Sequence, residues 1–290
     1  MINRNTNVDT TTNALLLQNP CYGQLLFGYS KFSQMILRRL GNKAKLSMRI
    51  QQYFPKHDIY IEPFFGCGGM FFSKPKAKHN ICNDLDGEIF NLYTIIQSHK
   101  DELIELIEAT PLSEHLFQYW KVNKETEPIR KALRFLCLTN LSFGGLMNTF
   151  NTNILTQDKE NFSRLINNAF KQMGNTKFLN KDFRELLKNL NFPHGDLDKA
   201  NCFIYADPPY IGTNDTFEYS FTEQDTSELF EILIGIGIRF MISEFDTPFI
   251  LGLAEKHKLN VITLGERKNL MNKRTEILIT NYEKPMSLFD

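Results

Sequence analysis

Residues 58–72 read DIYIEPFFGCGGMFF, and this stretch decides the fold that the sequence predicts. A short apolar run over 59–61 ends in an acid and a proline, and a loop with three glycines follows. Such a run, closed by turn residues, is typical of a strand buried in a parallel sheet. We therefore expect a strand, a glycine loop and the start of a helix.

The next segment repeats this plan. In residues 79–99, HNICNDLDGEIFNLYTIIQSH, Ile81 and Cys82 suit a short strand, and acids follow at its end. The helix expected after them has its apolar residues on one face, namely Ile89, Leu92, Tyr93 and Ile96. Alternating strands and helices, with acids and glycines at the strand exits, predict an α/β fold with a doubly wound parallel sheet.

The rest of the chain divides by pattern. Residues 1–20 are rich in Asn and Thr, lack a period and predict a flexible arm, and a helical pattern begins at Ser30. Long helical patterns replace the alternation over 98–175, and the α/β rhythm then resumes. We expect one α/β domain made of residues 21–97 and 176–290, interrupted by a helical insert over 98–175.

Composition limits the class of protein. The chain has 290 residues, of which 42% are hydrophobic and 23% charged, as in ordinary soluble domains. Its five cysteines are scattered without a Cys-x-x-Cys pair, so neither a disulfide framework nor a metal site is indicated. The N-terminal apolar run is too short for a signal peptide, and no run is long enough to span a bilayer. A cytoplasmic protein without membrane partners is expected.

Charge is balanced overall but segregated along the chain. The formal net charge is zero, which argues against a nucleic-acid-binding protein. Basic residues outnumber acidic ones by 8 to 1 over 1–57 and by 10 to 4 over 129–192, whereas acids dominate 84–128 and 193–260. Such blocks can face a polyanion on one side. A mosaic surface, on which the blocks do not coincide in space, is the alternative.

The glycine loop indicates a ligand site when it is considered with an acid further along the chain. Glycines let the backbone turn tightly and bring its N–H groups close to a ligand. Asp84 follows the next strand, where a nucleotide-type fold places an acid that accepts hydrogen bonds from a ribose. The glycine spacing is neither a dinucleotide fingerprint nor a P-loop. A nucleoside cofactor with little phosphate fits better than ATP, and a plain tight turn is the alternative.

A second chemical motif closes a later strand. Residues 203–212 read FIYADPPYIG, an apolar run followed by Asp207, Pro208, Pro209 and Tyr210. The prolines cannot donate to a sheet ladder, so the chain leaves the sheet as a stiff turn. This exit presents a carboxylate, free carbonyls and an aromatic face at one sheet edge. An isolated Asp-Pro would predict only a rigid exit with a solvated acid.

In this order, GYSKFSQMIL, IEPFFGCGGMFF, NDLDGEIFNLY, NKDF and ADPPY resemble the motifs of the Dam-type (D12 class) DNA adenine-N6 methyltransferases. The resemblance runs from about Phe27 to the closing strand EILITNY. It implies a Rossmann-like, seven-stranded S-adenosylmethionine-dependent methyltransferase sheet with a helical target-recognition insert. It also implies double-stranded DNA as partner, with a cognate restriction endonuclease as one option. The oligomeric state is open, and a monomer is favoured.

The resemblance assigns the cofactor S-adenosylmethionine to named positions. The glycine loop would hold it, Asp84 would bind its ribose, Asp182 its adenine, and Lys31 would lie near its carboxylate. The complete cofactor set implied is Phe27, Lys31, Pro63, Phe64, Phe65, Gly66, Gly68, Asp84, Asp182, Phe183 and Asp207.

The resemblance also implies a mechanism for Asp207, Pro208, Pro209 and Tyr210. Adenine N6 is a poor nucleophile because its lone pair is delocalised into the ring. Asp207 and the Pro208 carbonyl would accept both amino hydrogens and draw the nitrogen toward tetrahedral geometry. Tyr210 would stack on a base flipped out of the duplex. This direct displacement needs neither a metal nor a covalent intermediate.

The DNA-binding segment departs from the family pattern. TNLSFGGLMNTFN keeps Gly144, Gly145 and Leu146 but has Phe143 for a tyrosine, and Met147 and Asn148 where a basic residue is usual. The target sequence is therefore open, whereas the chemistry is not affected. The candidate DNA contacts are Lys121, Lys124, Arg130, Lys131, Arg134 and Asn140, against the alternative of a solvated helical face.

Two other functions fit parts of the sequence. Methylation of cytosine N4 or of RNA is an alternative, because the Asp-Pro-Pro-Tyr clamp requires only an exocyclic amine. A catalytically inactive DNA-binding relic is a second alternative from a different class, and the intact Asp207 motif argues against it.

Overall fold

The computed structural model describes residues 35–37, 43, 46–152, 159–211, 221–268 and 273–283, with the backbone alone at 266–268 and 273. The arm predicted over 1–20 lies outside the described residues. No described helix combines the length and the apolar character needed to cross a membrane.

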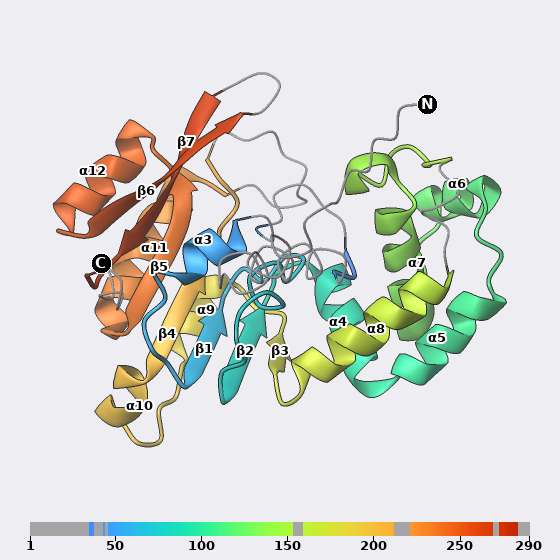
Figure 1. Cartoon of the computed structure of the whole chain (residues 1–290), viewed down its shortest axis with the longest axis horizontal. Helices are drawn as coiled ribbons and strands as arrows, with labels where there is room; N and C mark the ends of the chain where they lie inside the picture. Colours follow the sequence, from blue (N-terminus) through green and yellow to red (C-terminus); the bar gives the residue numbers. More distant parts are fainter. Residues whose placement is uncertain are drawn as a thin grey trace, which may run out of the picture.

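A seven-stranded sheet forms the centre of the fold (Figure 1). The strands lie in the order β3-β2-β1-β4-β5-β7-β6. All neighbouring pairs from β3 to β5 are parallel, and β7 is antiparallel to both of its neighbours, β5 and β6. The predicted seven-stranded, mostly parallel α/β sheet is confirmed. The strand bounds are β1 Ile59–Glu62, β2 His79–Asn83, β3 Lys177–Leu179, β4 Cys202–Ala206, β5 Arg239–Phe245, β6 Asn260–Lys268 and β7 Lys273–Thr280.

Helices cover both faces of the sheet because strand residues alternate between two cores. In β4, Phe203 and Tyr205 join one core while Ile204 joins the other. The first core includes α3 (Ser47–Gln51) and α4 (Gly87–Ser98). The second includes α9 (Phe183–Lys188), α11 (Glu223–Ile236) and α12 (Pro248–Lys256), and the short α10 (Asp196–Ala200) precedes β4.

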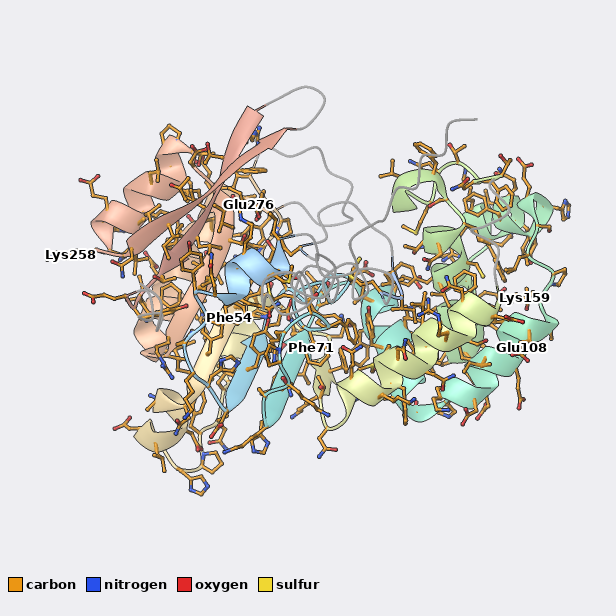
Figure 2. All side chains as sticks on the ribbon, viewed as in Figure 1. Phe54, Phe71, Glu108, Lys159, Lys258 and Glu276 are labelled. Carbon is orange, nitrogen blue, oxygen red and sulfur yellow. The ribbon has the colours of Figure 1, made fainter. Side chains whose placement is uncertain are left out.

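Helices fill the chain between α4 and β3, at the β3 edge of the sheet (Figure 1). They are α5 (Lys100–Ala109), α6 (Glu114–Val122), α7 (Pro128–Asn140) and α8 (Lys159–Met173), with a 3₁₀ turn at Phe143–Gly145. Lys159 of α8 donates to the carbonyl of Glu108 in α5 over 2.7 Å (Figure 2). The apolar core of these helices is continuous with the first sheet core. The insert therefore packs as part of the same body, and its predicted bounds of 98–175 stay a prediction.

Two local predictions were wrong. Residues 35–37, within the pattern that begins at Ser30, are not helical, and the first helix among the described residues begins at Ser47. After the glycine loop, residues 66–73 form successive turns rather than a helix. Gly66 and Gly68 both have positive φ, of 54° and 72°, and these values interrupt a right-handed helix at its first turn.

The strand order reverses between β1 and β4, which lie side by side. In open α/β sheets, ligands bind outside the carboxyl ends of the strands at such a point. The glycine loop leaves β1 there, and Asp207 leaves β4. Because β7 is antiparallel, its early residue Glu276 reaches the same edge, where it pairs with Phe245 at the end of β5.

Candidate active site

The glycine loop after β1 is shaped by close packing at Gly68. A Cβ built there would lie 2.6 Å from Cζ of Phe65 and equally close to the ring of Phe72. Since φ is also +72°, only glycine fits without a shift of its neighbours. Gly66 has φ of +54° but open space around its Cβ direction. The loop therefore exposes bare backbone at Gly66 and packs tightly at Gly68.

Asp84, at the end of β2, binds this loop. Its Oδ2 accepts a hydrogen bond from the Gly66 N–H over 2.6 Å, and its Oδ1 accepts one from Asp86 N–H over 2.9 Å. A carboxylate has about four acceptor sites, so Asp84 can accept several hydrogen bonds at once. Asp84 thus lies beside the glycine loop, as the motif spacing predicts.

Asn83 was not predicted, yet it joins three strand exits. Its buried side-chain amide donates to the Pro63 carbonyl over 3.0 Å and to the Lys181 carbonyl over 2.9 Å. Its Oδ1 accepts from Lys181 N–H over 3.0 Å. These bonds fix the loops after β1 and β3 relative to β2. Nothing in the local sequence NDLDG indicates that its asparagine, Asn83, joins three strand exits.

The aromatic residues predicted around the cofactor lie mainly in the core. Phe65 is buried in the first core and Phe183 in the second. Phe64 is half-buried and packs against the rings of Phe183 and Phe221, at centroid distances of 5.5 and 5.6 Å. Pro63 is buried. Of these four, Phe64 keeps the most accessible side chain.

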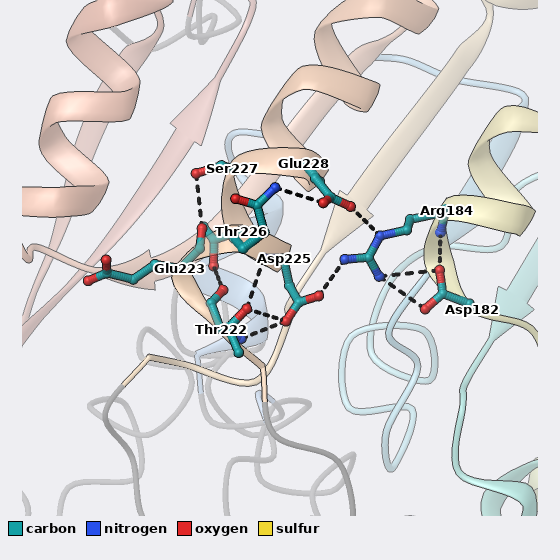
Figure 3. A network of polar contacts seen from close by, with 9 residues as sticks. Asp182, Arg184, Thr222, Glu223, Asp225, Thr226, Ser227 and Glu228 are labelled. Atoms are coloured by element: carbon teal, nitrogen blue, oxygen red, sulfur yellow. Dashed lines mark hydrogen bonds and ion pairs between the residues drawn. The ribbon is translucent and has the colours of Figure 1, made fainter.

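Asp182 follows β3 and belongs to a network of charges (Figure 3). It caps α9 by accepting from Arg184 N–H over 2.8 Å, and the Arg184 guanidinium lies 3.2 Å from its Oδ2. The same guanidinium also pairs with Asp225 and Glu228 of α11. Arg184 therefore joins the β3 exit to the helix that follows the Asp-Pro-Pro-Tyr segment in the chain.

Asp207 meets a buried lysine that was not predicted. The Lys43 ammonium lies 3.0 Å from Oδ1 of Asp207 and 3.0 Å from Oε1 of Glu276. Oδ1 is buried, whereas the Asp207 side chain as a whole keeps 18% exposure. One oxygen is thus held inside while the carboxylate stays accessible. Burial raises the pKa of Asp207, Lys43 opposes that rise, and Glu276 adds to it.

The Tyr210 hydroxyl points into the same cluster. It lies 2.8 Å from the Ser243 hydroxyl, donates to Glu276 over 3.1 Å and also contacts the Lys43 ammonium. Its ring meets Phe245 edge-on at a centroid distance of 4.6 Å. Pro208 is buried and Pro209 half-buried between Asp207 and Tyr210. Residues of strands β5 and β7 therefore hold the Tyr210 ring in place.

Glu244 supports this exit from the opposite face of β5. It is buried, and its Oε2 accepts from Phe245 N–H over 2.7 Å. Its Oε1 has no hydrogen-bond partner among the described residues. Burial raises the pKa of Glu244 to about 8, and the charge of Asp207 adds to this rise.

The predicted DNA contacts separate into two groups. Lys121, Lys124 and Arg130 are exposed and Lys131 is half-buried, and the Lys121 ammonium bonds the Asn148 carbonyl. Arg134 and Asn140, in contrast, are buried.

For Arg134 and Asn140 the predicted DNA contact is corrected. Arg134 donates to the carbonyls of Trp120 and Asn123, at 2.9 and 3.0 Å. Asn140 donates to the Ile36 carbonyl over 2.8 Å. The Arg134 bonds both come from its Nε–H, and its Nη1 lies 3.6 Å from Oε1 of Glu88, so both side chains are engaged inside the fold.

Phe27 and Lys31 lie outside the described residues. Among the described residues, Lys43 is the lysine that pairs with Asp207, and it also pairs with Glu276, from the strand predicted to close the sheet. The signal that could have found Lys43 is a basic residue beside glycine ahead of β1, in LGNK. For Ser243 and Glu276 the only signal is a polar residue at an inward position of a strand.

Comparisons with known proteins agree on one family. The family model described as D12 class N6 adenine-specific DNA methyltransferase matches residues 40–276, a range that includes Lys43 and Glu276 and begins after Lys31. The type II methyltransferase M1.LlaDCHI of Lactococcus lactis subsp. cremoris is 28% identical over 83% of this chain and 93% of its own. The DNA adenine methylase of Escherichia coli K12 is 26% identical over 80% and 88%. M.MjaIII of Methanocaldococcus jannaschii, another type II methyltransferase, is 25% identical over 85% and 98%.

Proposed function

This chain belongs to the D12 class of N6 adenine-specific DNA methyltransferases, and from that premise we propose that the sheet edge around Asp207 is its active site. The enzyme transfers a methyl group to N6 of adenine in DNA. One observation supports this site above all others. Asp207 leaves β4 beside the strand that carries the glycine loop, and a buried lysine holds its Oδ1 while the carboxylate keeps an accessible side.

The residues around the glycine loop fit S-adenosylmethionine. When bound, this cofactor supplies an electrophilic methyl group on a positively charged sulfur. The bare backbone at Gly66 allows close approach of a ligand, which a Cβ at this position would obstruct. The acids Asp84 and Asp182 at the neighbouring exits suit ribose hydroxyls, an adenine amino group and a positive sulfur, and they disfavour a polyphosphate. We therefore assign Asp84 to the ribose and Asp182 to the cofactor adenine.

Asp207 and the Pro208 carbonyl act on the target amine in this proposal. Two acceptors on the two amino hydrogens pull electron density onto N6 and orient its lone pair away from the ring. After methyl transfer the nitrogen carries an extra proton and a positive charge. The Asp207 carboxylate can accept that proton, because burial raises its pKa above that of a solvated aspartate. Tyr210 supplies the ring against which the extruded base stacks.

Lys43 keeps Asp207 ready for this role. An ammonium 3.0 Å away favours the charged carboxylate, which accepts hydrogen bonds more strongly than the neutral acid. We propose Lys43 as the lysine of this site. Lys31 and Phe27 keep their roles near the cofactor as predictions.

Double-stranded DNA is the proposed form of the substrate. The exposed basic residues of the insert, Lys121, Lys124, Arg130 and Lys131, are proposed to contact its phosphates. Because phosphate contacts carry no sequence information, the recognised bases are read elsewhere. A companion restriction endonuclease, a monomeric state and a cytoplasmic location stay predictions.

Mass analysis of nucleosides tests the activity directly. DNA from cells that express this chain should contain N6-methyladenine, and DNA from cells that express Asp207→Ala should not. Methylated cytosine in the DNA, or methylated nucleosides found only in RNA, would favour the alternative amine methyltransferases. Absence of any new methylated nucleoside, with folded protein present, would favour the inactive DNA-binding relic.

A further inference from the structure

Glu276 is a buried carboxylate on β7 with only 1% of its surface exposed (labelled in Figure 2). Its Oε1 receives three polar contacts, from the Lys43 ammonium at 3.0 Å, the Tyr210 hydroxyl at 3.1 Å and the Ser243 hydroxyl at 3.2 Å. These groups come from the segment before α3, from the Asp-Pro-Pro-Tyr exit and from β5. Glu276 therefore joins three separate segments at one oxygen.

Packing alone does not explain a carboxylate at this position. The next residues of β7, Ile277, Leu278 and Ile279, are buried and apolar, and an apolar side chain would complete that pattern. A buried charge is costly unless it is paired and hydrogen-bonded, and an apolar substitute is often at least as stable. The cost of Glu276 suggests a task other than stability.

One effect of Glu276 is on the ring of Tyr210. The ring can rotate about its side-chain bonds unless its hydroxyl is held. Here the hydroxyl has contacts to Glu276, Ser243 and Lys43, and the ring edge meets Phe245 at 4.6 Å. Phe245 pairs directly with Glu276 in the sheet. Strands β5 and β7 thus hold the Tyr210 side chain both at its hydroxyl and at its ring.

A second effect of Glu276 is on the charge at Asp207. Lys43 is shared between the two carboxylates at equal distances of 3.0 Å. Glu276 therefore holds the ammonium in place but also weakens its influence on Asp207. Four other ionisable groups lie close enough for the charge of Asp207 to raise their pKa values, namely Tyr205 and Tyr210 from β4 and its exit, Glu244 from β5 and Glu62 from β1.

We propose that Glu276 is a positioning residue for methyl transfer, which orients the Tyr210 ring through its hydroxyl and holds Lys43 against Asp207. This inference rests on the proposed active site at Asp207 but extends it to a strand outside the motif. Glu276 acts through Tyr210 and Lys43.

The test compares Glu276→Gln with an exposed carboxylate of α12, Glu255→Gln, as matched control. We expect Glu276→Gln to lower the single-turnover methylation rate by at least about tenfold, the lower end of what a hydrogen bond to a charged group is worth. The KM for S-adenosylmethionine should stay unchanged. Glu255→Gln should match the wild type in both.

The pH profile separates positioning from a purely structural role. Loss of the Glu276 charge lowers the pKa of Asp207, so the acidic limb of the rate profile should move to lower pH in Glu276→Gln. Removal of the cation in Lys43→Met should move the same limb to higher pH. Shifts in opposite directions are expected only if both groups act on Asp207.

Tyr210→Phe provides a second variant if Glu276→Gln does not fold, because it removes only the hydroxyl. It should slow methylation by a similar factor, and the double variant should be no slower than the slower single variant, since both break one contact. A wild-type rate and pH profile in folded Glu276→Gln, or a wild-type rate in Tyr210→Phe, would overturn the inference. In that case the wild-type enzyme would still yield N6-methyladenine, so the proposed function would stand.

Discussion

Oδ2 of Asp84 accepts a hydrogen bond from the backbone N–H of Gly66 over 2.6 Å, which ties the end of β2 to the glycine loop of β1. The same carboxylate is the proposed partner of the cofactor ribose. Asp84 therefore both shapes the loop and completes the site, and its loss should affect ligand affinity more than an ordinary surface acid would.

Asp84→Ala is expected to weaken S-adenosylmethionine binding by about 1.5–3 kcal/mol, the usual range for hydrogen bonds to a charged group. Titration calorimetry on the folded variant measures this change. Asp101→Ala, on an exposed position of α5, is the matched control and should bind as the wild type does. Unchanged affinity in folded Asp84→Ala would remove Asp84 from the cofactor site.

The two glycines of the loop should respond differently to alanine. Gly68→Ala places a methyl group 2.6 Å from the rings of Phe65 and Phe72, so we expect a loss of about 1–3 kcal/mol in unfolding free energy from overpacking, beyond the backbone strain. Gly66→Ala has open space and should lose only about 1–2 kcal/mol from its positive φ. Urea unfolding compares the two.

The loss of cofactor affinity should be larger in Gly66→Ala than in Gly68→Ala, the reverse of the order expected for the loss of stability. The methyl group of Gly66→Ala would project into open space beside the loop, where the ligand is proposed to approach. We expect Gly66→Ala to bind S-adenosylmethionine more weakly than its modest loss of stability implies. Equal stability losses in the two alanine variants would contradict the packing found around Gly68.

Lys131→Ala and Arg134→Ala separate a surface contact from a structural one. Lys131→Ala should reduce the salt dependence of DNA binding by about one unit, as for one lost phosphate contact, without a change in stability. Arg134→Ala leaves the carbonyls of Trp120 and Asn123 without their donor and should cost about 1–3 kcal/mol of stability. Binding isotherms at several salt concentrations and melting curves distinguish them. An unchanged salt slope in Lys131→Ala would mean that this lysine is only solvated.

Glu244 should make the stability of the enzyme fall as pH rises. Its folded pKa of about 8 lies above the unfolded value of 4.5, so the folded state binds the extra proton between these values. The stability contributed by that proton is complete below about pH 4.5 and is lost as pH rises toward 8. Glu244→Gln cannot lose a proton, so its melting temperature should gain on the wild type between pH 5 and 8. A constant difference across this range would show that Glu244 does not titrate there.

Much of the sheet edge could be predicted because its groups follow strands that the sequence marks clearly. Asp84, Asp182 and Asp207 each lie within three residues of the end of a short strand, and parallel strands place such exits at one edge. The contact between Lys43 and Tyr210 could not be predicted, because 167 positions separate them and no local pattern links them. Glu276 sits in a strand whose alternation explains its inward direction but not its partners.

For the DNA-binding candidates, in contrast, the sequence did not predict which side chains are accessible. Arg134 and Lys131 are three positions apart on one helix, so charge and spacing alone placed them on one face. The structure buries Arg134 against the end of α6 and leaves Lys131 partly accessible. A long cationic side chain can donate to backbone carbonyls instead of a ligand, and the sequence does not show which partner it has.

Asp207→Ala should act on the chemical step. The carboxylate is proposed to accept a hydrogen bond that strengthens as positive charge grows on the target nitrogen, so its loss raises the barrier rather than weakening ground-state binding. One preorganised group of this kind is worth on the order of a hundredfold to a thousandfold in rate.

The variant should still fold, because Lys43 keeps its ion pair with Glu276 at 3.0 Å when Asp207 is removed. Single-turnover methylation of a duplex oligonucleotide, with enzyme in excess and a melting curve alongside, measures both properties. If Asp207 only shaped the turn, stability and activity would fall together and the folded fraction would methylate at the normal rate. A folded Asp207→Ala enzyme with a near wild-type rate would therefore remove Asp207, and with it Lys43 and Glu276, from the chemistry of this protein.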